Sequence, residues 1–177
     1  MHRLDAHLAR LARSAPRATA VVLVNDETAS ETTTRLTWTE LDGVVDALAA
    51  RLRASWRTSN DDDDDDDDDA PARVVSLCRD GVAAVVALLA SSRARRSVVP
   101  LDAEAWPRAR IREAARVVGC LGRDDDDDAR TTPTVLCATR EEIPRAMEIF
   151  GARADVVVVS DVREDRAAAT ADAEPAA

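Results

Sequence analysis

The chain has 177 residues with 24 arginines, no lysine and no tyrosine, and 46% of its residues are hydrophobic. This length suits one domain with a packed core and excludes two large domains. The formal net charge of −10 comes from aspartate runs at residues 61–69 and 124–128, because outside the runs 20 acidic residues face 24 arginines. The total charge therefore indicates neither an acidic fold nor a basic partner.

Cysteine usage and hydropathy exclude further classes of protein. Cys78, Cys120 and Cys137 lie far apart and have no CxxC spacing, so we expect reduced thiols in an intracellular protein rather than a zinc site. No apolar run reaches the length of a membrane span. The arginines form no basic stripe interleaved with aromatic residues, so we expect no nucleic acid and no membrane as partners.

The N-terminal residues 1–16 are amphipathic and carry arginine. An organelle transit peptide and the first helix of a domain both have this pattern. Asp5 favours the helix, because transit peptides are poor in acidic residues. We therefore expect a cytoplasmic protein, with organelle import as the alternative.

The first predicted element is a helix over residues 2–14, followed by a buried strand over the continuous apolar run 18–24. Residues 25–34 have no core pattern and predict a loop. The apolar face of the helix consists of Leu4, Leu8, Leu11 and Ala12.

The clearest helix of the chain follows a short strand at residues 35–38. Thr37 and Glu40 have the Ser/Thr-x-x-Glu spacing of a capping box, which predicts a helix start. Residues 56–72 include the first aspartate run and predict a disordered loop, because adjacent carboxylates repel one another and bury nothing. The helical apolar stripe comprises Leu41, Val44, Val45, Leu48, Ala49 and Leu52.

Strands and helices then alternate to the end of the chain. Asp80 is expected to cap one helix with an apolar face at Val82, Val85, Val86 and Leu89. Pro107 opens the next helix, whose inward residues are expected to be Ile111, Ala114, Ala115 and Val118, before Gly119 ends it. The last helix covers residues 141–150. The expected strands are residues 74–78, 97–100, 134–137 and 155–160.

The C-terminal segment is rich in alanine from Glu164 onward. We expect it to be disordered. The domain organisation is thus a domain at residues 1–163, with residues 61–69 and 124–128 as disordered loop insertions, and a tail at residues 164–177.

This alternation predicts an α/β fold, with a Rossmann-like, mostly parallel sheet and flanking helices. Both aspartate runs follow a helix and precede a strand, and such loops lie at the amino ends of parallel strands. Ligands of such sheets bind beyond the carboxyl ends. We therefore expect both runs to lie on the side of the sheet away from any active site.

Five segments, in order and spacing, resemble the N-terminal portion of the adenylate-forming (AMP-binding) synthetases and ligases. The resemblance spans residues 4–160 and implies a partial N-terminal subdomain of an enzyme of the acyl-CoA synthetase or amino-acid-activating type. Its first core motif is Leu36-Thr37-Trp38-Thr39-Glu40-Leu41, and its second is Val98-Val99-Pro100-Leu101-Asp102 followed by Pro107 and Arg110-Ile111. The other segments are residues 18–22, 47–53 and 74–90.

The second motif departs from the family pattern. Arg95 and Arg96 stand where the family has glycine, Arg93 stands in for a lysine, and Val98 for a tyrosine. Glycine would permit a tight backbone geometry that arginine disfavours.

The resemblance implies ATP and Mg²⁺ in the complete enzyme, which uses a glycine-rich loop ending in lysine and a late catalytic lysine. This chain has no lysine and five isolated glycines, so no backbone nest for phosphate is expected. We therefore assign no catalytic, cofactor-binding or metal-binding residue, and expect no cofactor in this chain.

Other candidate residues have structural explanations. His2 and His7 have no metal-ligand spacing and are expected at the surface. Asp80 and Asp102 follow predicted strands, where sites lie, but a helix cap and a turn explain them. The aspartate runs have no glycine turns that would shape a cation site.

The sequence thus predicts the N-terminal fragment of an AMP-dependent ligase, which activates a carboxylate by adenylation and forms a thioester. We expect the chain alone to be inactive. The implied partners are the remainder of the adenylating domain and, in the full enzyme, a carrier protein or CoA. The alternatives are a non-catalytic Rossmann-like binding or assembly module and, third, a protein that binds partners through its acidic runs.

Overall fold

The computed structural model describes residues 4–24, 33–59, 73–79, 81–121 and 133–171. The aspartate runs, His2 and Asp80 lie outside the described residues, so the expectations about them stay predictions. The helices are α1 (Leu4–Ser14), α2 (Trp38–Ser59), α3 (Gly81–Arg93), α4 (Arg108–Val117), α5 (Ile143–Phe150) and α6 (Val159–Ala171), with a 3₁₀ turn η1 at Arg140–Glu142. The strands are β1 (Thr19–Val24), β2 (Thr33–Thr37), β3 (Arg73–Ser76), β4 (Ser97–Pro100), β5 (Thr134–Cys137) and β6 (Asp155–Val158).

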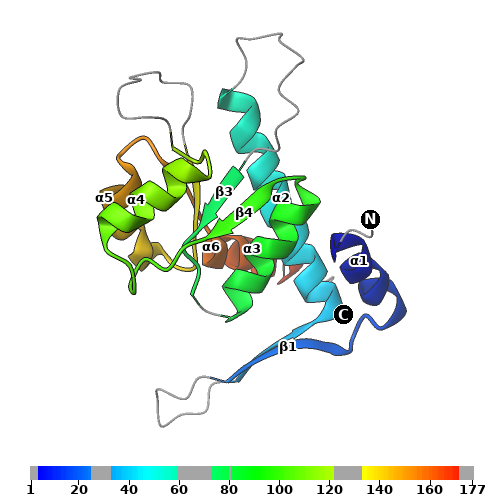
Figure 1. The fold of residues 1–177 in the computed structure, drawn as a ribbon. Coiled ribbons are helices and arrows are strands. Elements are labelled where there is room, and N and C mark those ends of the chain that lie inside the picture. Colours follow the sequence, from blue (N-terminus) through cyan, green and yellow to red (C-terminus); the bar gives the residue numbers. More distant parts are fainter. Residues whose placement is uncertain (1–3, 25–32, 60–72, 80, 122–132, 172–177) are drawn as a thin grey trace.

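The expected parallel sheet is confirmed. It has four strands in the order β4-β3-β5-β6, and every neighbouring pair is parallel. Helices flank it on both sides, with α4 and α5 on one side and α2, α3 and α6 on the other (Figure 1).

Two hydrophobic cores lie on the two faces of this sheet. Val74 and Leu136 belong to the core that contains α2, α3 and α6. Val75 and Val135 belong to the core that contains α4 and α5. Successive side chains of a strand point to opposite faces, so these short apolar strands are buried on both sides, as in other parallel sheets with two helical layers.

Strand β1 differs from the prediction of a buried strand at residues 18–24. It pairs with β2 in a separate, antiparallel two-stranded sheet, which Figure 1 shows extending away from the parallel sheet. Ala18 and Thr19 are exposed, whereas Ala20 and Val21 are half-buried against the core of α2 and α3. A continuous apolar run does not reveal how many of its faces are covered.

The predicted capping box at the start of α2 is confirmed. The backbone N–H and the hydroxyl of Thr37 both donate to Glu40 Oε2 at 2.8 Å, and the Glu40 N–H donates to Thr37 Oγ1 at 3.3 Å. The hydrogen bonds from Thr37 lower the pKa of Glu40, and the bond from the Thr37 backbone N–H has the largest effect. The stripe from Leu41 to Leu52 is between 0% and 5% exposed, and the helix continues past Trp56 to Ser59.

Helices α1 and α3 bury most of the faces predicted for them, but one predicted inward residue of each helix is exposed. Leu4 is 49% exposed and Val85 38%, although both were expected to face inward. Helix α3 buries Val82, Val86 and Leu89 as predicted. It also buries three alanines that were not predicted to face inward: Ala83, Ala87 and Ala90. It is apolar on most sides, so its period does not identify one face, and small side chains allow its backbone to pack closely.

The C-terminal segment also differs from the prediction. Residues 164–171, expected to be a disordered tail, continue helix α6. Val159 and Val162 are 1% and 2% exposed and anchor the start of this helix, while Asp165 accepts a hydrogen bond from Arg51 of α2 at 2.5 Å. Alanine, the strongest helix former, extends a helix that is anchored in this way.

Helices α3 and α4 end in the same hydrogen-bonded motif. The residue with the left-handed backbone is an arginine after α3 and a glycine after α4. In α4, Gly119 has φ of +69°, and its N–H and that of Cys120 bond back to Arg116 and Ala115. Arg95 has φ of +58° at the equivalent position after α3, with matching bonds. Both are Schellman motifs, which favour glycine. Arg95 therefore adopts the geometry expected of the family glycine, at a cost in backbone strain.

We predict that Arg95→Gly stabilises the protein and Gly119→Ala destabilises it. The left-handed conformation costs an L-residue about 1–2 kcal/mol, and the extra freedom of glycine in the unfolded chain offsets about 0.4–1 kcal/mol. Urea unfolding should show a net gain of roughly 0.5–1 kcal/mol for Arg95→Gly. Arg96→Gly is the control and should destabilise; a loss of stability in both arginine variants would contradict the assignment of strain.

We also predict that Glu40 makes stability pH-dependent. Because its folded-state pKa is lowered, its contribution is full above its ordinary pKa of about 4.3 and is lost as pH falls through the lower folded value. Glu40→Gln should therefore cost roughly 0.5–1 kcal/mol at pH 7 and much less near pH 3. Thermal unfolding across this range measures the difference. Exposed Glu141→Gln is the control, and an equal pH-dependence in both variants would refute the role of Glu40.

Candidate functional site

The carboxyl edge of the parallel sheet is the candidate site, because ligands of open α/β sheets bind there. The segments after β3, β4, β5 and β6 meet at this edge. Three backbone hydrogen bonds extend the strand pairing into these segments: Leu77 N–H to Leu136 O at 2.8 Å, Leu101 N–H to Ser76 O at 2.9 Å and Ser160 N–H to Ala138 O at 3.1 Å. These bonds hold the first residues after the strands in line with the sheet.

Asp102, one of the two carboxylates singled out in the sequence, forms a turn at this edge. Its Oδ1 accepts the backbone N–H groups of Glu104 at 3.0 Å and Ala105 at 2.9 Å. These two bonds lower the pKa of Asp102. The expectation of a turn-forming residue is confirmed, and the carboxylate is held ionised by its own loop.

The other charged groups of this edge are engaged with one another. Arg79 pairs with Glu104, and Arg140 Nε donates to Asp161 Oδ1 at 2.8 Å. Glu142 Oε2 accepts the backbone N–H of Ala138 at 2.7 Å. These contacts fix the loops after β3, β5 and β6. Within the described chain they act as framework contacts that do not converge on one point.

The Cys137 thiol at this edge is unsuited to nucleophilic attack. Cys137 is 0% exposed, and burial, with a smaller effect of Glu142, raises its pKa to about 12. Cys78 is half-buried and lies 3.7 Å from the Leu136 carbonyl. A reactive cysteine needs a lowered pKa and access to solvent. None of Cys78, Cys120 and Cys137 forms a disulfide in the described chain.

Arg93, which replaces the family lysine, lies in a structural cluster away from this edge. Its guanidinium donates to Asp42 Oδ1 at 2.6 Å and to Asp46 Oδ1 at 2.7 Å, and also to the Asp5 carbonyl at 3.4 Å. The Arg93 side chain is 11% exposed. It therefore joins α1, α2 and α3.

Sequence reasoning missed this cluster. Its signal is the pair Asp42 and Asp46, four residues apart beside the apolar stripe of α2, which places two carboxylates on one line of the helix. A partner for them on another helix is not visible in the sequence.

Of the two histidines, only His7 lies in the part of the chain that the structure describes. His7 is exposed on α1 and hydrogen-bonds Arg10 at 2.9 Å. In the part of the chain that the structure describes, no group of three or more His, Cys, Asp or Glu side chains could hold a metal ion. The helices of that part include none long and apolar enough to cross a bilayer.

Several solved structures that resemble this chain are adenylate-forming enzymes. A fatty acyl-adenylate ligase from L. pneumophila, in complex with acyl adenylate and pyrophosphate, matches 94% of this chain with a TM-score of 0.62 and 19% identity. A fatty acid AMP ligase from Legionella pneumophila matches 94% with a TM-score of 0.63 and 18% identity. The Klebsiella oxytoca NpsA N-terminal subdomain, in complex with anthranilyl-AMSN, matches 92% with a TM-score of 0.59 and 14% identity.

The chain has the fold of the N-terminal part of adenylate-forming enzymes. The family resemblance expected from the sequence is thus confirmed at the level of fold. The chain spans only 25% of the two Legionella proteins and 32% of the NpsA subdomain. No protein-family model and no curated protein matches its sequence.

We predict that Arg93→Met destabilises the protein strongly, because it leaves Asp42 and Asp46 without their shared cation. Removing one partner of a buried ion pair costs about 3–5 kcal/mol, and the partial exposure of Asp46 places the expected loss near the lower value. Urea unfolding measures it. Arg145→Met is the matched control, since Arg145 pairs with Glu148 at 2.8 Å but is 40% exposed; its loss should be below about 1 kcal/mol. Equal losses would contradict a structural role specific to Arg93.

Proposed function

We propose that this chain is the N-terminal subdomain of an AMP-forming ligase that activates a carboxylate as its acyl adenylate and transfers the acyl group to a thiol. The supporting observation is the match of 94% of the chain to a fatty acyl-adenylate ligase. The order of the two sequence motifs supports it independently. Thr37 and Glu40 of the first motif cap α2, and Asp102 of the second forms the turn after β4.

The proposed substrate is a carboxylic acid, and the proposed acceptor is the thiol of a carrier protein or of CoA. A fusion of the adenylation protein NpsA with ThdA, described as an adenylation–PCP di-domain, matches 93% of this chain with a TM-score of 0.60. This neighbour supports a carrier protein as the acceptor. The sequence Val-Pro-Leu-Asp at residues 99–102 favours the amino-acid-activating branch of these enzymes over the branch that activates fatty acids.

The residues present do not fit ATP and Mg²⁺. The chain has no lysine for the triphosphate, and its glycines are isolated along the sequence. At the carboxyl edge, Arg79 and Arg140 are paired with Glu104 and Asp161. In this proposal the chain supplies the sheet edge and the turns that support the site, and the nucleotide-binding residues come from the missing remainder of the adenylating domain.

We predict that the 177-residue chain by itself gives no carboxylate-dependent ATP–pyrophosphate exchange. The same chain joined to the product of the coding sequence downstream should give exchange, because that segment is expected to supply a Gly/Ser/Thr-rich loop ending in lysine. Replacing that lysine by alanine in the joined protein is the control and should abolish the exchange.

Two outcomes would contradict the proposal. Exchange by the isolated chain would refute its inactivity. A downstream sequence without the loop, beside a stable transcript that ends after the 177 residues, would favour the non-catalytic binding or assembly module.

A further inference from the structure

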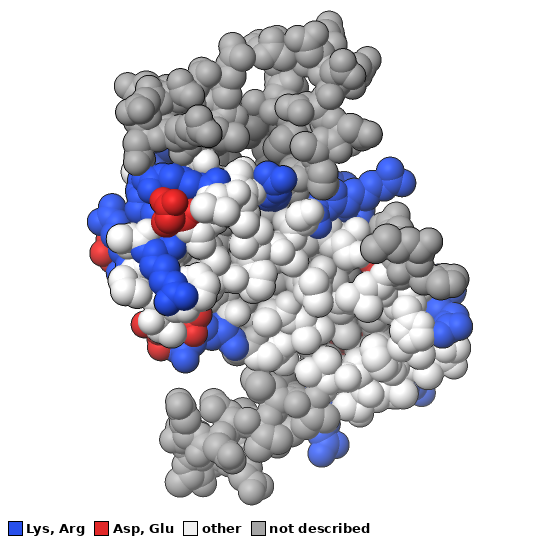
Figure 2. Space-filling view, in the orientation of Figure 1, with Lys and Arg blue, Asp and Glu red and all other residues white. Residues whose placement is uncertain are grey.

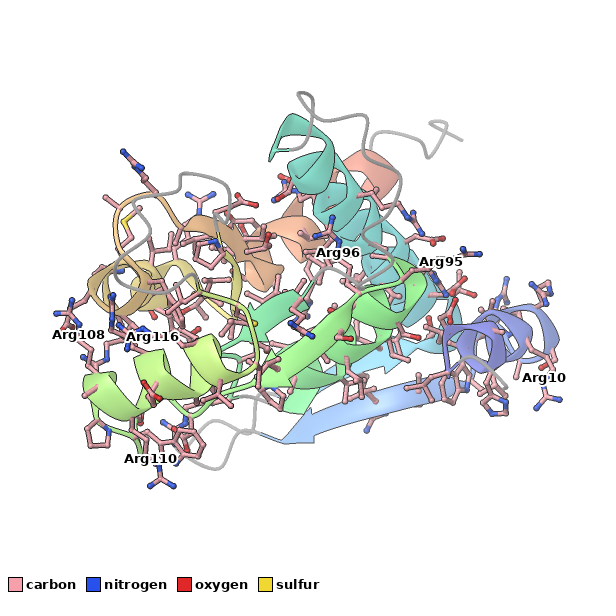
Figure 3. All side chains as sticks on the ribbon, turned by 45° about the horizontal axis from the view of Figure 1, so that its top comes forward. Arg10, Arg95, Arg96, Arg108, Arg110 and Arg116 are labelled. Carbon is pink, nitrogen blue, oxygen red and sulfur yellow. The ribbon has the colours of Figure 1, made fainter. Side chains whose placement is uncertain are left out.

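Arginines gather at the amino edge of the sheet, opposite the candidate site. We call this set the arginine rim. Figure 2 shows arginine surface along the upper border of the described surface, and Figure 3, with that side turned forward, shows Arg95, Arg96 and Arg116 on it. The rim consists of Arg53, Arg73, Arg95, Arg96, Arg116 and Arg153.

The topology explains why these arginines share one edge. Arg73 begins β3, and Arg95, Arg96 and Arg153 immediately precede β4 or β6. Arg116 lies in the last turn of α4. The helices that cross between parallel strands end at this edge, and their carbonyl ends favour cations. Arg53 uses such an end, because it donates to the Arg93 carbonyl at 2.7 Å, in the last turn of α3.

The rim carries more positive than negative charge. Asp155 begins β6 at this edge and accepts a hydrogen bond from Ser55, and Glu113 pairs with Arg116 at 3.4 Å. Among the residues that the structure describes, the six arginines of the rim therefore outnumber these two carboxylates. Burial lowers the pKa of half-buried Arg96, and the negative charge of Asp155 acts in the opposite direction.

The two aspartate runs join the described chain at this same edge. Residues 61–69 connect the end of α2 at Ser59 to the start of β3 at Arg73. Residues 124–128 connect the end of α4 to the start of β5 at Thr134. Such short tethers hold a ligand at an effective concentration in the millimolar range. The runs carry nine and five carboxylates, enough to neutralise the rim.

We propose that the arginine rim is a docking surface for the chain's own aspartate runs, residues 61–69 and 124–128. The attraction is between carboxylates and guanidinium groups, most of them exposed, and needs no single conformation of the runs. It lowers the mutual repulsion of the rim arginines in the folded state. Because the charges are exposed, salt weakens the attraction over a Debye length of about 10 Å at 0.1 M.

A mutant cycle that replaces charged residues by neutral ones tests this docking. One variant has serine at all aspartates of both runs. A second, the rim variant, carries Arg73→Gln, Arg95→Gln and Arg153→Gln, all exposed positions. The matched control has the same change at exposed Arg13, Arg17 and Arg108. The rim variant and the control are each made with the original runs and with the serine runs. The melting temperature of every protein is measured in 20 mM and 500 mM NaCl.

In 20 mM NaCl the serine runs should lower the melting temperature by about 5 °C, and in 500 mM by much less. The drop should be at least halved in the rim variant and unchanged in the control. Equal drops in all three backgrounds, or a drop that salt does not reduce, would overturn the proposal.

Binding of added polyanions gives a second test that does not depend on stability. A fluorescent deca-aspartate peptide should bind the serine-run protein at least tenfold more tightly than the wild type, because the runs compete for the rim. Equal binding by both proteins would overturn the proposal. Tight binding of polyuridylate by the wild type, lost in the rim variant, would assign the rim to nucleic acid and overturn it as well.

Discussion

The parallel pairing of β3 with both β4 and β5 is the constraint on which the rest of this structure depends. Parallel neighbours cannot be joined by tight turns, so each connection must cross the sheet through a helix. These crossings produce the two helical layers and the two cores. They also separate the loops into two sets, one at each edge of the sheet, with different chemistry.

The carboxyl edge is stabilised by its own polar groups. Asp102 closes a turn, Glu142 bonds a backbone N–H, and Arg140 pairs with Asp161. These contacts fix the loops after the strands, and in the proposed function this edge supports residues from the remainder of the enzyme. At the amino edge, helix ends collect arginines, and the low-complexity runs join the chain there. A surface away from the chemistry tolerates such insertions, because loop closure entropy grows slowly with length.

Much of the fold could be predicted because the signals were local. The capping box of Thr37 and Glu40 and the stripe from Leu41 to Leu52 lie within one helix, and both were identified correctly. The turn at Asp102 needs only the next three residues. Where the partners were distant, prediction was wrong. β1 was expected to be buried but pairs with β2 outside the parallel sheet, and Val85 was expected inside but is exposed.

The sequence by itself determined the alternation of strands and helices, the start of α2 and the turn after β4. Each of these depends on neighbours within a few residues or on composition. Only the tertiary structure decided that Arg93 joins three helices through Asp42 and Asp46, that Arg95 takes a glycine-like backbone, and that residues 164–171 stay helical. It also decided that six separate arginines form one rim. These features depend on contacts between residues far apart in the chain, and the sheet brings them together.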